Sequence, residues 1–351
     1  MKKKFIWIIL LAVVLLVGIL VLSMDGKKEK KTVEKDDKIQ IGMSFDSFVI
    51  ERWQRDRDVF VSTAKELGAE VNVQNANGDI EEQKKHIDYF IEKGVDAIVV
   101  ICIDSYGLQE QVKKAMDAGI IVVAYDRMIT NANTDLYISF DNSMVGSMMG
   151  EALVKNGVGG GDVLMLGGSP TDSNVPIVET AFKEVMEENN VTILESFHAD
   201  NWEAELAATY VYENMNVVMR ADAIMCGNDN LASQVVRALA EKRLAGDILV
   251  VGQDADLEAC QRIVEGTQLM TVYKPVEKLA QRAAECTVEL IVNGELDGED
   301  VLSIDDGTYI IPYVGIQPIS VTESNMDAII IDSGFHLKED VYLNVPGKMP
   351  K

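Results

Sequence analysis

Three glycines, Gly68, Gly94 and Gly119, recur in the first third of the chain at spacings of 26 and 25 residues. Each follows a segment with helical periodicity and precedes a run rich in β-branched residues. Glycine is favoured at the end of a helix because it adopts the left-handed conformation without strain. Continuous apolar strands are typical of a parallel sheet covered on both faces. The spacing therefore predicts the strand–helix units of a doubly wound α/β fold.

The same alternation continues through most of the chain. A first series of strands is expected at residues 39–45, 70–74, 97–102 and 120–125, with helices at 51–67, 79–93 and 106–118. A second series has strands at 163–166, 191–197, 223–226, 249–251 and 269–273, with helices at 177–188, 203–214, 231–242 and 257–265. A turn-rich segment near residues 140–144 separates the two series, which favours two lobes over one large sheet.

The N-terminus carries a separate signal. Lys2, Lys3 and Lys4 precede an unbroken apolar run of 18 residues, 5–22, which as a helix is about 27 Å long and matches a bilayer core. Residues 1–24 are therefore expected to be a membrane anchor or a signal peptide that exports the rest of the chain. The run is longer than the apolar region of a usual signal peptide, which is about 7 to 15 residues, and this favours the anchor. Residues 25–38 then form a charged linker.

The charge of the chain excludes one class of partner. Its net charge is -25, composed of +4 over residues 1–38 and -29 over the remaining 313 residues. A nucleic-acid partner requires a basic face, so we expect no nucleic-acid binding. We expect the positively charged residues 1–38 to direct the chain to the membrane rather than to form part of the folded body.

Polar and aromatic side chains follow most of the expected strands. In an open α/β sheet, ligands bind beyond the carboxyl ends of the strands. These positions hold Arg52, Trp53, Asp126, Arg127, Asp141, Asn142, Asp172, Asn174, Asn201, Trp202, Asn228, Asp254 and Lys274. Acids, amides and arginine suit the hydroxyls of a sugar, and indole rings suit its C–H face. Each residue alone also fits a helix cap, an ion pair or core packing.

Several motifs give a more specific indication. They are ERWQRDRD (51–58), AYDRMI (124–129), YISFDN (137–142), GGSPTDSN (167–174), GNDN (227–230), GQDADL (252–257), GTQLMTVYKP (266–275) and DSGFH (332–336). With these motifs the chain resembles the ribose/galactose-type periplasmic-binding family, and within it the extracytoplasmic D-xylose binders. The matching stretches span residues 39 to about 340.

The resemblance implies two lobes joined by a three-segment hinge that closes on one monosaccharide, most simply D-xylose, with another pentose or a hexose as the alternative. One lobe would comprise residues 39–142 and about 275–305, the other 143–274 and about 306–345. The ligand residues implied by position are Arg52, Trp53, Asp126, Arg127, Asp172, Asn174, Trp202, Asn228, Asp254 and Lys274.

Two outputs of sugar binding stay open at this point. The closed form could deliver the sugar to an ABC permease, or it could signal to a membrane sensor histidine kinase. An enzyme is not expected, because the sequence has no P-loop, no Gly-x-Ser-x-Gly and no spacing of its three histidines that indicates a metal site. No cofactor is expected either. A DNA-binding regulator would need a helix-turn-helix where the apolar run stands.

Overall fold

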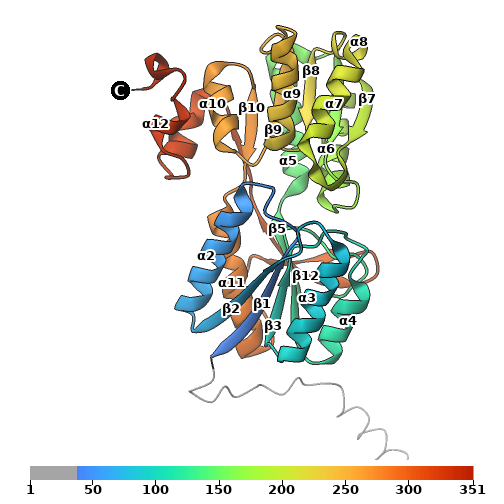
Figure 1. Ribbon diagram of the computed structural model, residues 1–351, viewed down its shortest axis with the longest axis vertical. Helices are drawn as coiled ribbons and strands as arrows, with labels where there is room; N and C mark the ends of the chain where they lie inside the picture. The colour runs from blue at the N-terminus through green and yellow to red at the C-terminus, as the bar shows by residue number, and fades with distance from the viewer. Residues whose placement is uncertain (1–37, 351) are drawn as a thin grey trace, which may run out of the picture.

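The computed structural model describes residues 38–350, which form two α/β lobes lying end to end (Figure 1). This architecture confirms the predicted fold class of two doubly wound lobes. The N-terminal apolar segment and the linker, apart from Lys38, lie outside the described residues. None of the helices between residues 38 and 350 combines the length and the hydropathy that spanning a membrane requires.

The first lobe is built on a seven-stranded sheet in the order β11-β12-β5-β4-β3-β1-β2. Its strands are β1 (Ile39–Phe45), β2 (Ala69–Asn75), β3 (Ala97–Val100), β4 (Ile121–Tyr125), β5 (Leu136–Phe140), β11 (Val301–Asp305) and β12 (Ile310–Ile316). Its helices are α2 (Arg52–Glu66), α3 (Ile80–Lys93), α4 (Gln109–Asp117) and α11 (Val276–Asn293). Helices α2 and α11 pack together, as do α3 and α4, so both faces of the sheet are covered.

The second lobe has a six-stranded sheet in the order β13-β10-β9-β8-β6-β7. Its strands are β6 (Asp162–Gly167), β7 (Thr192–His198), β8 (Ala223–Cys226), β9 (Leu249–Gln253), β10 (Met270–Tyr273) and β13 (Ile319–Val321). Its helices are α5 (Asn142–Leu153), α6 (Asn174–Glu188), α7 (Ala204–Glu213), α8 (Met215–Val218), α9 (Asp229–Glu241), α10 (Leu257–Glu265) and α12 (Lys338–Val341). Helix α5 packs on α6 and α7 packs on α9.

The three glycines that indicated the fold have the expected backbone. Gly68, Gly94 and Gly119 have φ angles of 86°, 65° and 78°, in the left-handed region. Each follows a helix, and Gly94 closes α3 by donating its backbone N–H to the carbonyl of Ile91. The glycine spacing was therefore a correct indicator of where the helices of the first lobe end.

The described chain passes between the sheets at three points, between β5 and α5, between β10 and α11, and between β12 and β13. The expected lobe boundary near residue 305 differs from this arrangement. Strand β12 pairs in parallel with β5 of the first sheet from Tyr313 to Ile316, so the first lobe extends to Ile316. The reason is that β11 and β12 form an antiparallel hairpin, which keeps both strands at one sheet edge.

The segment near residues 140–144, expected to be turn-rich, is a crossing point with little turn. Strand β5 ends at Phe140, and α5 begins at Asn142. Asp141 makes this abrupt start possible, because its side chain accepts a hydrogen bond from the backbone N–H of Met144 and caps the helix.

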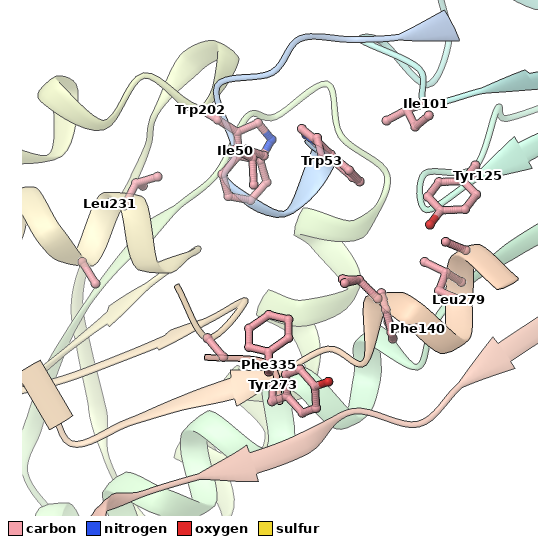
Figure 2. Close-up of a cluster of buried hydrophobic side chains, with 14 of the residues drawn as sticks. Ile50, Trp53, Ile101, Tyr125, Phe140, Trp202, Leu231, Tyr273, Leu279 and Phe335 are labelled. Atoms are coloured by element: carbon pink, nitrogen blue, oxygen red, sulfur yellow. The ribbon is translucent and has the colours of Figure 1, made fainter. Parts of the chain in front are cut away.

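One apolar cluster runs through both lobes. It contains Phe60 and Tyr125 of the first lobe and Leu231 of the second. Ile50, Trp53, Phe140, Trp202, Tyr273 and Phe335 lie in the same cluster where the lobes meet (Figure 2). Each lobe has one further apolar cluster, which lies on the opposite face of its sheet: under α3 and α4 in the first lobe and under α5 and α6 in the second. The lobes thus share apolar packing next to the strand ends.

A tight helix contact gives a first prediction. A Cβ atom on Gly146 of α5 would collide with the backbone carbonyl of Val178 on α6, so only glycine fits there. Gly146→Ala should therefore destabilise the protein by about 1–3 kcal/mol, although alanine is the better helix former. Gly159→Ala is the control, because nothing lies near its Cβ position. A thermal melt in which Gly146→Ala is as stable as the control would contradict the close α5–α6 packing.

Candidate functional site

A cavity lies between the two lobes at the carboxyl ends of the parallel strands. All ten ligand residues implied by the family resemblance contribute to its wall, whereas the strand-end residues Asp141, Asn142 and Asn201 do not. The first lobe supplies Arg52 and Trp53 at the start of α2 and Asp126 and Arg127 after β4; the second lobe and the crossing to α11 supply Asp172, Asn174, Trp202, Asn228, Asp254 and Lys274. The structure therefore gathers residues that are up to 222 positions apart, from Arg52 to Lys274.

The cavity is small. About 30 Å³ is open to the centre of a water molecule. Adding the water radius of about 1.4 Å on every side gives on the order of 150 Å³ of empty space. That volume is about the size of a single sugar ring.

The first-lobe wall is held by a buried ion-pair network around Arg52. Its Nε and one terminal nitrogen donate to the two oxygens of Asp56 at 3.1 and 3.0 Å. The other terminal nitrogen lies 2.8 Å from Asp126, and the guanidinium lies over the Trp53 ring at 4.4 Å. Burial raises the pKa of Asp126, but the charges of Arg52, Lys274 and Arg127 outweigh it, so the pKa is lowered. Asp126 therefore stays a carboxylate facing the cavity.

Arg127 connects the two lobes. It donates to Asp46 of the first lobe at 2.7 Å and lies 2.6 Å from Asp172 of the second. All three side chains are buried. Burial raises the pKa of both acids, and one guanidinium offsets this effect only in part. The ion pair between Arg127 and Asp172 joins the lobes across the cleft.

Asn174 adds a second polar link between the lobes. Its side-chain nitrogen donates to the backbone carbonyl of Asp126 at 3.1 Å and to the carboxylate at 3.2 Å. Its oxygen accepts from the Asn142 side chain at 2.9 Å, next to the first crossing. Asn174 thus fixes the position of Asp126 while it lines the cavity.

Trp202 forms the aromatic wall of the second lobe. Its indole nitrogen donates to Asp172 at 3.2 Å, and a Cβ atom on Gly168 would overlap its six-membered ring. A Cβ atom on Gly227 would meet the backbone of Gly168 and then the same ring. These two glycines therefore let the indole lie flat against the strand ends. Figure 2 shows Trp202 and Trp53 approaching the site from different lobes.

Asp254 and its neighbour are in strained conformations. Asp254 has φ 97° and Ala255 has φ 55°, and non-glycine residues rarely adopt such angles. The backbone N–H of Ala255 donates to Thr271 at 3.1 Å, and Thr271 donates to the buried Asp229 at 2.6 Å. These bonds hold the turn that brings Asp254 to within 3.3 Å of the Lys274 nitrogen. Burial raises the pKa of Asp229 to about 7.

Asn228 combines two roles. Its side chain accepts a hydrogen bond from the backbone N–H of Leu231 at 2.9 Å and so caps α9. It is 1% exposed and also lines the cavity. The sequence left open whether Asn228 caps a helix or lines the site, and in the structure its side chain does both.

Unpaired polar atoms collect around the cavity. Among the described residues, seven buried side-chain polar atoms have no well-aligned hydrogen bond, and six of them belong to cavity-lining residues. They are Trp53 Nε1, Asp126 Oδ2, Arg127 Nε, Glu179 Oε1, Gln253 Oε1 and Asp254 Oδ1. Those of Asp126, Arg127 and Asp254 lie within ion-pair distance of an opposite charge, and that of Glu179 lies 2.8 Å from the His198 ring, all without hydrogen-bond alignment. Trp53 Nε1 and Gln253 Oε1 have no hydrogen-bond partner among the described residues. Buried polar groups normally find partners, so the unused hydrogen-bonding capacity of these atoms indicates a polar ligand.

The remaining wall residues were not foreseen as site residues. They are Ile50, Gly167, Gly168, Val175, Val178, Glu179, Met225, Gly227 and Gln253. Gln253 immediately precedes Asp254, and its side chain donates to the backbone carbonyl of Gly227. The strand-end rule could have included Gln253, which ends β9, and Gly167 and Gly168, which stand where β6 ends. Glu179 lies within α6, where no sequence signal distinguishes it from a surface acid.

Comparisons with known proteins agree with this geometry. The chain is 38% identical over 310 residues to the D-xylose-binding periplasmic protein of Haemophilus influenzae, covering 87% of this chain and 92% of the other. It is 39% identical over 309 residues to the protein of the same name in Escherichia coli, covering 86% and 92%.

Solved structures show the same fold. An ABC transporter solute binding protein from Clostridium phytofermentans with bound β-D-glucose superposes with a TM-score of 0.77 at 26% identity, covering 86% of this chain and 99% of the other. A family model described as "Periplasmic binding protein domain" matches residues 41–296. The chain belongs to this family of periplasmic binding proteins.

Proposed function

We propose that the protein binds one monosaccharide, D-xylose, between its lobes by hinge closure and delivers it to an ABC importer. The observation that carries the proposal is the set of buried polar atoms without a well-aligned hydrogen bond around a cavity the size of one sugar ring. The names of the two relatives at 38% and 39% identity support xylose as the sugar. Another pentose or a hexose is the alternative ligand.

The wall offers what a neutral sugar needs. Asp126 and Asp254 accept hydrogen bonds from ring hydroxyls, and Arg52, Arg127 and Lys274 donate to hydroxyl oxygens. Asn174 and Asn228 supply an amide from the second lobe, and Asp172 orients the Trp202 indole. Trp202 and Trp53 supply apolar ring faces for the C–H side of the sugar. The proposal includes binding and release, without a catalytic step.

The proposed setting is outside the cytoplasm. The two relatives described above are periplasmic proteins, which supports an extracytoplasmic site of action. In the proposal, residues 1–24 tether the protein to the cytoplasmic membrane and 25–38 act as a spacer. The importer receives the sugar from the closed form. Signalling to a sensor histidine kinase stays an untested alternative.

Loss of a cavity carboxylate should weaken sugar binding. Removing a buried, charged hydrogen-bonding partner costs on the order of 1.5–3 kcal/mol, so Asp126→Ala and Asp254→Ala should each reduce D-xylose affinity about ten- to a hundredfold or more. Isothermal titration calorimetry of the purified variants measures this change.

The control is Asp117→Ala, because Asp117 is the exposed last residue of α4 and pairs with Lys113 of the same helix, far from the cavity wall. It should bind sugar as the wild type does. If both cavity variants bind D-xylose with wild-type affinity, the assignment of these carboxylates to the site is wrong.

A methyl group at Gly168 should displace the Trp202 ring. The added Cβ atom would occupy the place of the Trp202 ring and push the indole into the cavity. Gly168→Ala should therefore fold but bind sugar at least about tenfold more weakly, since overpacking shifts the wall into the space for the ligand. Titration followed by tryptophan fluorescence measures the affinity. Wild-type affinity in this variant would show that Trp202 does not contact the sugar.

The cellular output can be tested separately from binding. Deleting the gene should abolish or strongly reduce high-affinity uptake of radiolabelled D-xylose, while induction of xylose genes by internal sugar persists. Complementation with the wild-type gene should restore uptake, and the Asp126→Ala gene should not. Normal uptake together with lost induction would overturn the importer proposal in favour of sensing.

A further inference from the structure

Two loops meet across the cleft beside the cavity. One follows β3 in the first lobe and contains Ser105; the other follows β6 in the second lobe and contains Thr171 and Ser173. The backbone N–H of Ser105 donates to the backbone carbonyl of Thr171 at 3.0 Å. The Thr171 hydroxyl donates to the backbone carbonyl of Ile103 at 3.2 Å. The backbone N–H of Met128 donates to the Ser173 hydroxyl at 2.9 Å.

Ser105 is at the centre of this contact. Its hydroxyl donates to the Thr171 carbonyl at 3.0 Å and accepts from the backbone N–H of Ser173 at 2.9 Å. A serine hydroxyl has one proton and two lone pairs, so it can make both bonds at once. Ser105 is only 1% exposed, although it stands in a loop at the edge of its lobe. The second lobe covers it.

The contact lies outside the cavity wall. The cavity wall includes none of Ser105, Thr171 and Ser173, although Asp172 and Asn174 of the same loop line it. Successive residues of this loop therefore have separate tasks: Asp172 and Asn174 line the site, while Thr171 and Ser173 bond to the opposite lobe. The five hydrogen bonds described above join protein to protein alone.

We propose that Ser105, Thr171 and Ser173 form a latch that sets how long the closed protein holds its sugar. This inference rests on the proposed function, since it concerns the release of the proposed ligand. The three residues are positioning residues, because they act on the equilibrium between open and closed lobes and do not touch the sugar.

The physical basis is population shift. The apparent affinity of a hinged protein is proportional to the fraction of molecules in the closed form, so it rises when that fraction rises. Bonds present only in the closed form raise this fraction and must break before the sugar leaves. A weaker latch therefore accelerates release, while association, which begins from the open form, changes little.

Outside the cavity wall, another contact between the lobes is different in kind. Arg55 of α2 donates to the backbone carbonyl of Phe335 at 2.8 Å, and its guanidinium lies 4.1 Å from the Phe335 ring centre. The Arg55 side chain is 35% exposed, so solvent screens this contact. The serine latch is buried from solvent at Ser105, which makes it the stronger determinant of closure.

The test is stopped-flow kinetics with D-xylose on the full chain. Ser105→Ala should raise the dissociation rate roughly five- to a hundredfold, as expected for the loss of two hydrogen bonds, with the association rate unchanged within about twofold. Ser173→Ala, which removes the bond from Met128, should raise it about two- to tenfold. Ser47→Ala is the matched control, because the Ser47 hydroxyl accepts only from the backbone of Val49 within its own loop.

The outcomes separate the latch from the proposed function. Wild-type dissociation rates in both serine variants would overturn the latch, and so would a fall in association rate at unchanged dissociation rate. If the wild type binds neither D-xylose nor any other pentose or hexose, the proposed function fails. The latch is then tested by small-angle scattering of the sugar-free protein: it predicts that Ser105→Ala has a larger radius of gyration than the wild type, and equal radii would overturn it.

Discussion

The site depends on Arg127 and its two acids. A buried charge is stable only when an opposite charge and hydrogen bonds replace the water it has lost. Arg127 meets this need with Asp46 from its own lobe and Asp172 from the other, so its burial requires the lobes to be together. Asp172 in turn orients Trp202, and Asn174 orients Asp126. The closed cleft and the arrangement of its wall therefore have a common electrostatic cause.

Strained backbone conformations also fix the arrangement of the cavity wall. Asp126, Trp202 and Asp254 all have positive φ angles, which non-glycine residues avoid. Asp126 and Asp254 stand directly after a strand, Trp202 stands in the short 3-10 turn that follows β7, and all three line the cavity. The strain persists because the surroundings hold it, as Thr271 and Asp229 do for the turn after Asp254. A rigid wall of this kind limits the reorganisation needed when a ligand binds.

Much of the fold and the site could be predicted from the sequence, for identifiable reasons. Apolar strands and glycine-ended helices depend on local propensity, so the strand–helix units that were predicted are correct within a few residues, whereas β5, α5 and α11 were not predicted. The rule about strand ends gave a larger set of candidates, and the family resemblance reduced it to the ten residues that line the cavity. Strand β12 was missed because its place depends on pairing with β5, a contact distant in sequence. Glu179 was missed because its burial at the cavity depends on how α6 packs, and the roles of Gly168 and Gly227 depend on where the Trp202 ring lies.

The most direct measurement is a crystal structure of the protein grown with D-xylose. The account predicts electron density for one pentose ring between the lobes, in contact with Trp202, Asp126 and Asp254, with hydrogen bonds to the wall atoms that have no well-aligned hydrogen bond in its absence. An empty cavity at saturating sugar, or a sugar bound elsewhere while these atoms keep their present contacts, would contradict it.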